Sequence, residues 1–253
     1  KVPDFFLIHD YICPVNVVID IGNTSTKVAT FESNTLVEVQ NCLAKEVNDL
    51  LASIKFEKGI VSSVKEEKFS IDILNQYPTI IKLTKKLKIP IVNSYSTPDS
   101  LGYDRLSNAV GAYAIEAGRN SLIIDAGTCL KFDFIDDQNR YLGGSISPGL
   151  LMRLKSLHTF TDKLPLVELK KPEKLIGGST KESILSGVVG GMSSEINSLI
   201  SEYHKKYSLL KVFVTGGDVD FIYPMVDNQK SSIFAHDYIT LLGLNAILEE
   251  NAT

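Results

Sequence analysis

The sequence contains little cysteine. Its three cysteines, Cys13, Cys42 and Cys129, are far apart and form no Cys-x-x-Cys pair, and its four histidines are equally scattered. A disulfide framework or a zinc site is recognised by characteristic cysteine and histidine spacings, so we expect neither here. Unpaired thiols are typical of a reducing compartment, which predicts a cytoplasmic protein.

Long apolar runs and an excess of basic residues are also absent. No apolar run approaches the roughly 18 residues that a membrane-spanning helix needs. The chain has 26 Lys and Arg residues and 30 Asp and Glu residues, which gives a net charge of −4 and a pI near 5.6. This balance argues against a general binder of nucleic acid or anionic membranes, and we expect neither partner.

The remaining composition is that of an ordinary globular protein. Hydrophobic residues make up 44% of the chain and charged residues 22%, which excludes wholesale disorder. A length of 253 residues suits one large domain or two of modest size. Residues 1–14 begin with Lys and show no apolar region followed by a cleavage-like site, so we treat them as a leader of uncertain status.

A sequence pattern occurs twice in the chain. Residues 15–20 (VNVVID) and 121–125 (SLIID) are short buried-strand patterns that both end in Asp-x-Gly. Each is followed by a strand, a polar turn and another strand, and the two Asp-x-Gly turns are 105 residues apart. The repeat predicts an internal duplication with halves at 15–117 and 118–253.

Strand patterns alternate with helical patterns, which predicts an α/β fold. The pair Ser179 and Glu182 forms a capping-box pattern that opens a long helix containing Gly187, Gly190 and Gly191. Glycines inside a helix indicate close approach by another backbone or a bound group. Other strands are expected at 27–31, 36–39, 59–64, 89–92, 130–135 and 211–215, and helices at 46–55, 65–74, 79–87, 103–116, 150–157, 179–207 and 237–249.

The segment Asp20–Lys27 (DIGNTSTK) has the composition of a phosphate-binding turn. Glycine lets a phosphate approach backbone N–H groups, and hydroxyls and Lys27 can donate to phosphate oxygens. Asp20 can hold Mg²⁺ through water. An ordinary hairpin turn would use the same residues, and no Walker A pattern is present.

Two later turns extend this pattern. Asp125–Thr128 (DAGT) copies the first turn, and two such turns facing each other across a cleft are the layout of the actin, hexokinase and acetate kinase superfamily. In those folds a turn such as Thr215-Gly216-Gly217 lets adenosine lie flat on the backbone, although a plain helix-entry turn also fits. Gly102–Arg105 (GYDR) opens a helix, where the acid and base also suit capping and surface charge.

Short motifs follow one another in the order DIGNTSTK, SSV, GYDR, DAGT, GGSISPG, LP, TGG and HDYITLLGL. With these motifs in this order, the chain resembles type III pantothenate kinase from Val15 to about Leu248. The resemblance implies a duplicated actin/hexokinase/acetate kinase-like (ribonuclease H-like) fold. It implies ATP-dependent phosphorylation of pantothenate to 4'-phosphopantothenate, the first step of coenzyme A synthesis. The alternatives are another kinase or phosphatase of the superfamily and a non-enzymatic regulator of the family.

The resemblance also assigns roles to individual residues. Asp104 would be the catalytic base, and Asp125 would bind a monovalent cation, K⁺ or NH₄⁺. Asp20 would hold Mg²⁺ through water. The family is a homodimer, and Thr180 would reach pantothenate in the partner subunit. The implied ATP-binding residues are Asp20, Gly22, Asn23, Thr24, Ser25, Thr26, Lys27, Thr128, Gly216 and Gly217, and the implied pantothenate-binding residues are Tyr95, Gly102, Tyr103, Asp104, Arg105 and Thr180.

Two segments depart from the family pattern. After Ser62 and Ser63 the family usually has a proline two residues after its Val, but Val64 is followed by Lys65 and Glu66. After DAGT the family shows small or hydroxyl residues, whereas this chain has Cys129, Leu130 and Lys131. Lys131 either supplies a positive charge in place of the cation or points elsewhere. Strand alternation argues for the second, since Thr128 and Lys131 are three residues apart. The first alternative predicts a weakened dependence on K⁺.

Overall fold

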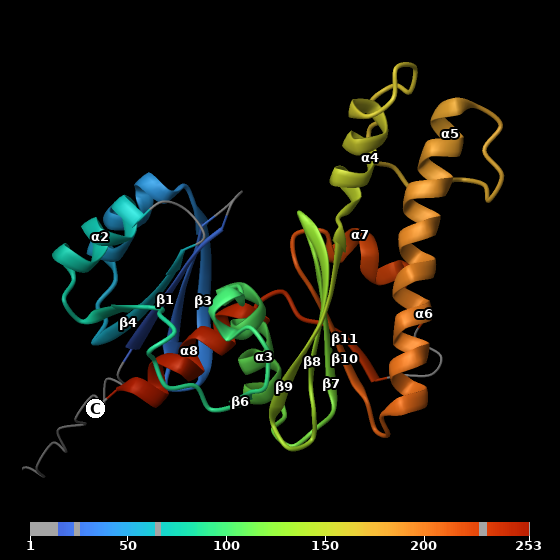
Figure 1. The fold of residues 1–253 in the computed structure, drawn as a ribbon. Helices are drawn as coiled ribbons and strands as arrows, with labels where there is room; N and C mark the ends of the chain where they lie inside the picture. The colour runs from blue at the N-terminus through green and yellow to red at the C-terminus, as the bar shows by residue number, and fades with distance from the viewer. Residues whose placement is uncertain (1–14, 23–25, 64–66, 228–231, 253) are drawn as a thin grey trace, which may run out of the picture. The chain divides into compact units, whose positions relative to one another are not determined.

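The computed structural model describes residues 15–22, 26–63, 67–227 and 232–252. The chain divides into two compact units between Leu87 and Lys88, and residues 251–253 group with the first unit. The predicted halves, 15–117 and 118–253, follow the sequence repeat rather than this division and stay a prediction. Strands and helices alternate in both units (Figure 1), so the predicted α/β class is confirmed.

The first unit is built on a five-stranded sheet with the order β3-β2-β1-β4-β5. Alternate residues of β1, Val17, Ile19 and Ile21, face one side of this sheet and form a core with residues of α1 and α2. The elements are β1 (Val15–Ile21), β2 (Thr26–Glu32), β3 (Thr35–Cys42), η1 (Ala44–Glu46), α1 (Val47–Ser53), β4 (Lys58–Ser63), α2 (Glu67–Gln76) and β5 (Ile80–Lys82).

The second unit is built on a six-stranded sheet with the order β11-β10-β7-β8-β9-β6. Its elements are β6 (Val92–Asn93), η2 (Pro98–Ser100), α3 (Tyr103–Ile115), β7 (Ser121–Ala126), β8 (Cys129–Ile135), β9 (Arg140–Pro148), α4 (Leu150–Thr159), α5 (Thr180–Leu185), the π-helical turn η3 (Ser186–Gly190), α6 (Gly191–Lys206), β10 (Lys211–Thr215), α7 (Val219–Ile222), η4 (Tyr223–Met225), β11 (Ser232–Ala235) and α8 (Ile239–Asn251).

The two sheets share one connectivity. In each, a strand ending in Asp-x-Gly pairs antiparallel with the next strand and parallel with a later one. The order β3-β2-β1-β4-β5 of the first sheet recurs as β9-β8-β7-β10-β11 in the second, which adds β6 beside β9. The predicted duplication is therefore confirmed.

Side chains of β7 and β8 alternate between the two faces of the second sheet. One face carries Leu122, Ile124 and Ala126 of β7 and Leu130, Phe132 and Phe134 of β8, and it forms a core with α6 and α7. The alternate residues project to the opposite face, where α3 packs against both strands. Figure 1 shows α3 and α6 on opposite sides of this sheet. The residues on the α3 side include Ile123, Asp125, Lys131 and Asp133.

Helix α3 is held in place by a close crossing with α8. A Cβ atom added to Gly111 of α3 would lie 2.0 Å from the carbonyl oxygen of Ile239, and one added to Gly243 of α8 would lie 1.9 Å from that of Ser107. Only glycine fits at either position without moving backbone. This crossing fixes the start of α3, where the GYDR segment lies.

Most predicted elements are present within a few residues, but the helix expected at 79–87 is wrong. Ile80–Lys82 instead form β5, in parallel register with Gly59, Ile60 and Val61 of β4. Adjacent β-branched isoleucines suit a strand packed in a sheet. Pairing with β4 therefore overrides the helical spacing.

The predicted long helix comprises α5, the π-helical turn and α6. Ser179 caps it, because its side chain accepts a hydrogen bond from the Glu182 backbone N–H at 3.3 Å. A Cβ atom added at Gly187, Gly190 or Gly191 would meet nothing within 4 Å. The close approach expected at these glycines is thus not made by any described part of the chain. None of the described helices combines the length and apolarity needed to cross a bilayer.

Candidate active site

Lys131 lies between two carboxylates at one end of the second sheet. Lys131 and Asp125 are direct cross-strand neighbours on β8 and β7, so their side chains share the face toward α3. The Lys131 Nζ atom is 2.7 Å from Oδ2 of Asp125 and 2.5 Å from Oδ2 of Asp104, in the first turn of α3. Thr128 precedes β8 and lies in a bend, so strand alternation does not relate it to Lys131.

The charges of this cluster shift the pKa values of Lys131 and Asp104. The side chains of Lys131 and Asp125 are 16% and 15% exposed, and that of Asp104 is 39% exposed. Burial lowers the pKa of Lys131, but both carboxylates outweigh it and hold that pKa above its ordinary value. Burial raises the pKa of Asp104, but the charge and hydrogen bond of Lys131 hold it below its ordinary value. Both side chains are therefore charged at neutral pH.

Asn108 and Thr240 support this cluster from the helix side. Asn108 is fully buried on α3, and its Nδ2 donates to Oδ2 of Asp125 at 3.2 Å. The Thr240 hydroxyl of α8 donates to Oδ1 of Asn108 at 2.6 Å. Sequence reasoning missed both residues. The spacing of Asn108 four residues after Asp104 is the signal that could have found it, because it puts both on one face of α3.

Arg105 is anchored by a carboxylate that the sequence did not single out. Its Nε donates to Oδ1 of Asp133 at 2.9 Å, and its Nη2 lies 2.7 Å from the same oxygen. Tyr141 also donates to that oxygen, at 2.6 Å. Burial raises the pKa of Asp133, while hydrogen bonds from Arg105 and Tyr141 oppose the rise.

The remaining edge of the Arg105 guanidinium faces Tyr95. Nη1 is 3.5 Å from the Tyr95 hydroxyl, and the Arg105 Cζ atom lies 5.5 Å from the centre of the ring. Gly143 has a φ of +95°, and a Cβ atom added there would lie 2.9 Å from the Tyr95 ring. Tyr103 opens α3, and a Cβ atom added at Gly102 would lie 2.5 Å from Oδ1 of Asp104. The structure thus gathers all the predicted pantothenate residues except Thr180 near the start of α3.

The Gly-Gly turn packs directly on the DAGT turn. Gly216 has a φ of +102°, and an added Cβ atom would lie 2.2 Å from the carbonyl oxygen of Ala126 and 2.6 Å from Oδ1 of Asp125. The backbone N–H of Asp218 donates to the Ala126 carbonyl at 2.9 Å. Gly217 has open space around it. The turns that carry Thr128, Gly216 and Gly217 are therefore neighbours, although they are far apart in sequence.

The first turn lies in the other unit. Asp20 and Lys27 are direct cross-strand neighbours on β1 and β2, and both are partly buried. Gly22 is partly buried, and Thr26 is buried at the start of β2. The predicted ATP-binding residues Asn23, Thr24 and Ser25 lie outside the described residues, as does the departure at 64–66. That the two phosphate turns face each other stays a prediction.

Comparison with known proteins identifies the family. Residues 16–202 match the family model described as type III pantothenate kinase. A protein of that name from Christiangramia forsetii is 42% identical over 94% of this chain and 100% of its own length. Another from Phocaeicola vulgatus is 41% identical over 94% of this chain and 99% of its own length. This chain belongs to the type III pantothenate kinase family.

Solved structures agree on the fold of this family member. A Campylobacter jejuni protein assigned to the Baf family of transcriptional activators has a TM-score of 0.60 at 21% identity, covering 93% of this chain and 98% of that one. A ROK family glucokinase from Streptomyces griseus has a TM-score of 0.52 at 11% identity, with 93% and 98% coverage. These likenesses concern the fold alone, and they confirm the predicted actin-like, hexokinase-like architecture.

In this member of the family, Thr180 lies apart from the predicted pantothenate residues at the start of α3, which belong to the same unit. It is exposed at the start of α5 and lines a groove of about 530 Å³ with Arg153, Leu157 and Ile184. None of the other predicted site residues lines that groove.

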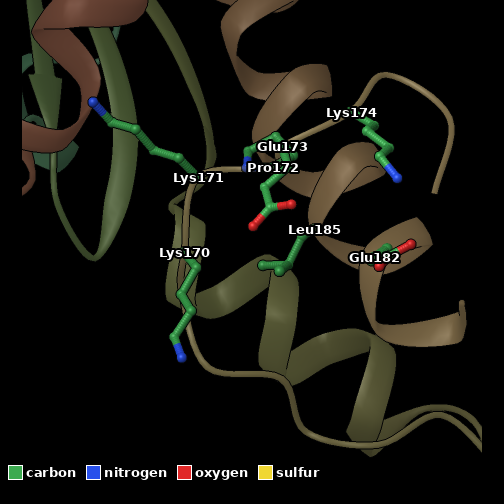
Figure 2. A pocket seen from close by; sticks show the side chains of 7 residues that line it. All are labelled: Lys170, Lys171, Pro172, Glu173, Lys174, Glu182 and Leu185. Atoms are coloured by element: carbon green, nitrogen blue, oxygen red, sulfur yellow. The ribbon is translucent and has the colours of Figure 1, made fainter. Parts of the chain in front are cut away.

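A smaller pocket of about 160 Å³ is lined by residues 170–174 and by Glu182 and Leu185 of α5. Figure 2 shows the side chains of Lys170, Lys171 and Lys174 pointing in different directions, so their ammonium groups do not converge on one ligand. No predicted site residue lines this pocket.

The described residues form no cluster of three or more carboxylate, histidine or cysteine ligands for a metal ion. A Mg²⁺ ion held by one carboxylate, water and substrate phosphates needs no such cluster, so Asp20 fits the predicted role. A monovalent cation at Asp125 fits poorly, because the Lys131 ammonium already contacts Oδ2 of that residue.

Proposed function

We propose that this protein phosphorylates pantothenate with ATP and forms 4'-phosphopantothenate, the first intermediate of coenzyme A synthesis. The observation that carries the proposal is the cluster at the start of α3, in a chain that belongs to this kinase family. There Lys131 of β8 holds the ionised carboxylate of Asp104. Asp133, two residues further along the same face of β8, holds the Arg105 guanidinium, whose Nη1 lies by the Tyr95 hydroxyl. An acceptor for a hydroxyl proton and donors for a substrate carboxylate are thus held on one face of the same strand.

In this proposal Asp104 accepts the proton of the primary hydroxyl of pantothenate. Lys131 holds one oxygen of Asp104 and lowers its pKa, so the carboxylate is a weak base. A weak base is adequate because phosphoryl transfer passes through a loose transition state in which the proton leaves late. Catalysis then rests mainly on positioning and charge neutralisation.

Arg105 binds the pantothenate carboxylate in this proposal. Asp133 and Tyr141 fix the guanidinium plane, which leaves the Nη1 group beside Tyr95 for the substrate. A planar, preoriented guanidinium suits a carboxylate better than a lysine ammonium would. Tyr103 and Gly102 complete the binding segment.

ATP is proposed to bind at three turns, with Mg²⁺ held through water by Asp20. The Gly22 turn with Thr26 and Lys27 would bind phosphates, and Thr128 would contact ATP from the second turn. Gly216 and Gly217 would lie under the adenosine. Mg²⁺ would neutralise the charge that develops on the phosphate oxygens. The supporting observation is the contact between the DAGT and Gly-Gly turns, since a Cβ-free backbone at Gly217 is open to a ligand.

The proposed location of the protein is the cytoplasm. This proposal rests on the small number of cysteines and the absence of a disulfide pattern in the sequence.

A homodimer is proposed to complete the site through Thr180. The α4 helix and the chain leading to α5 expose large apolar side chains, which a second copy would cover. These include Leu151 at 62%, Phe160 at 84%, Leu175 at 90% and Ile176 at 82% exposed. Contiguous exposed apolar surface is typical of protein interfaces. The open space at Gly187, Gly190 and Gly191 would let a partner helix approach closely.

The deciding experiment is a phosphorylation assay with ATP, Mg²⁺ and a panel of pantothenate, several sugars and acetate. Formation of ADP and 4'-phosphopantothenate, with the other acceptors inactive, supports the proposal. Turnover of a sugar instead would make the protein another kinase of the superfamily. No turnover with any acceptor would favour a non-enzymatic role.

The dimer is tested by mixing two inactive variants, Asp104→Asn and Thr180→Ala. If each site combines Asp104 of one subunit with Thr180 of the other, a mixed dimer contains one intact site, and re-association should restore about a quarter of native activity. No restoration, despite verified subunit exchange, would overturn the shared site. A protein that sediments as a monomer and is still fully active would also overturn the shared site.

A further inference from the structure

We propose that Lys131 is a built-in cation: its ammonium takes the place at Asp125 where a monovalent ion is predicted, so this protein binds no K⁺ or NH₄⁺ there. The kinetic part of this inference rests on the proposed function, but the binding part does not.

Both oxygens of Asp125 already have protein atoms beside them. Oδ2 lies 2.7 Å from the Lys131 Nζ atom and accepts a hydrogen bond from Asn108 at 3.2 Å. Oδ1 lies against Gly216, where an added Cβ atom would come within 2.6 Å. A free cation at Oδ2 would therefore have to displace the lysine.

The ammonium of Lys131 has the chemistry of the ion that it replaces. Like NH₄⁺, it is a compact positive charge with several N–H donors. Its two short contacts, to Asp104 and Asp125, are charge-assisted hydrogen bonds, the stronger class. Lys131 is part of strand β8, so no ion has to bind from solution for Asp104 and Asp125 to be partly neutralised.

Strand register explains why this lysine and no neighbour can play the role. Lys131 is directly opposite Asp125, and Leu130 and Phe132 on either side of it belong to the apolar core on the other face. Asp133, two residues further along the same face, is engaged with Arg105. The position opposite Asp125 is therefore the one that reaches both carboxylates.

The inference makes Lys131 a positioning residue as well. Its ammonium holds Oδ2 of Asp104 and fixes the orientation of the proposed base. Replacing Lys131 should therefore lower kcat more than it changes the KM for pantothenate, which depends on Arg105 and Tyr95.

The experiment compares the native protein, Lys131→Thr and Lys131→Met in KCl, NH₄Cl and choline chloride at one ionic strength. The first readout is the melting temperature without substrates, which does not depend on the activity. We expect the native melting temperature and activity to be the same in all three salts. Lys131→Thr opens a space beside two carboxylates, so K⁺ or NH₄⁺ should raise its melting temperature.

The kinetic readout follows the same variants. In choline, Lys131→Thr should lose about tenfold or more in activity, the scale seen when a group that orients a site is removed. K⁺ or NH₄⁺ should restore much of that loss. Lys131→Met fills the space without a charge, so neither ion should rescue it. Lys205→Thr, at an exposed lysine that pairs with Glu202, is the control and should behave like the native protein.

Two results would overturn the inference. One is a native protein whose melting temperature or activity rises strongly with K⁺ but not with choline, which would mean that an ion binds despite Lys131; this result stands even if Lys131→Thr does not fold. The other is an equal response of Lys131→Thr and Lys131→Met to the ions. Neither result bears on whether pantothenate is the substrate, which the acceptor panel decides separately.

Discussion

The two phosphate-type hairpins of the duplicated sheets carry the same pair of side chains. In the first unit Asp20 of β1 is directly opposite Lys27 of β2, and in the second Asp125 of β7 is directly opposite Lys131 of β8. Each aspartate also has a hydroxyl residue beside it on the parallel strand, Ser62 in one case and Thr215 in the other. The duplication thus preserved an Asp–Lys cross-strand pair as well as a connectivity.

The two hairpins differ in the length of the turn. Four residues separate the last paired positions, Ile21 and Thr26, of the first hairpin, and three separate Ala126 and Leu130 of the second. In the second, helix α3 brings another carboxylate, Asp104, onto the lysine. The same pair can therefore serve two purposes: Lys27 is proposed to bind phosphate, whereas Lys131 holds carboxylates.

The largest expected effect comes from removing the carboxylate that α3 brings to the second hairpin. Asp104→Asn keeps the shape of the side chain but loses the proposed base. We expect kcat to fall by about 10²–10⁴-fold, the usual contribution of a general base. Steady-state kinetics with pantothenate measure it, and circular dichroism checks that the fold is kept.

Asp99→Asn is the matched control, because Asp99 is an exposed aspartate of η2 in the same unit. It should leave kcat unchanged. An Asp104→Asn variant with near-native kcat would show that Asp104 is not the base.

Changing Lys27 and Lys131 each to methionine tests whether the two lysines have different roles. Lys27→Met should raise the KM for ATP by about tenfold or more, since it removes a phosphate contact made in the ground state as well. Lys131→Met should instead lower kcat and leave the KM for ATP nearly unchanged, because that lysine acts on Asp104. If both variants show the same kinetic pattern, the two lysines do not have separate purposes.

The equivalence of the two lysines was hidden in the sequence by turn length. The aspartates and glycines of the repeat are 105 residues apart, so that spacing applied to Lys27 leads to Phe132. The second hairpin has one residue fewer, which shifts its lysine to position 131. The apolar alternation of Leu130, Phe132 and Phe134 did contain the information that Lys131 and Asp133 share a face.

Other parts of the site could be predicted only in part. The duplicated sheets and the residues of GYDR, DAGT and TGG follow from local patterns, and the structure has them at strand and helix ends. The partners of Asp133 and Asn108 could not be predicted, because they are 28 and 17 residues away in sequence and depend on how α3 packs on the sheet. The helix expected at 79–87 failed for the related reason that pairing with β4 decides its conformation.

A third prediction concerns stability and pH. The pKa of Asp104 lies below its ordinary value in the folded protein, so this group stabilises the fold above its unfolded-state pKa of about 3.9, and the contribution is lost as the pH falls through the lower folded value. In Lys131→Met, burial without the ammonium should raise that pKa instead. The loss of unfolding free energy in the variant should therefore be small near pH 3 and larger near pH 7.

Urea unfolding between pH 3 and 7 measures this difference, with Lys205→Met as the control. A penalty for Lys131→Met that does not change with pH would contradict the charge interaction and leave only a packing role for the lysine.

The smallest expected effects concern the backbone that follows the hydroxyl residue, Ser62 or Thr215, because the two copies of the sheet differ there. In the first copy β4 continues through Ser63, whereas in the second β10 ends at Thr215 and Gly216 turns away with a φ of +102°. Gly216→Ala should cost about 1–3 kcal/mol of unfolding free energy, because a Cβ atom is strained at that φ and would press on the Ala126 carbonyl. Gly217→Ala, with open space around it, should change stability by less than about 0.5 kcal/mol and should instead raise the KM for ATP if adenosine lies on that backbone. Urea unfolding and ATP kinetics on both variants separate the two glycines. Equal stability losses in the two variants would mean that the turn moves to accommodate a side chain at Gly216. The packing of this turn on Asp125 would then not be what holds the Asp125 carboxylate in place.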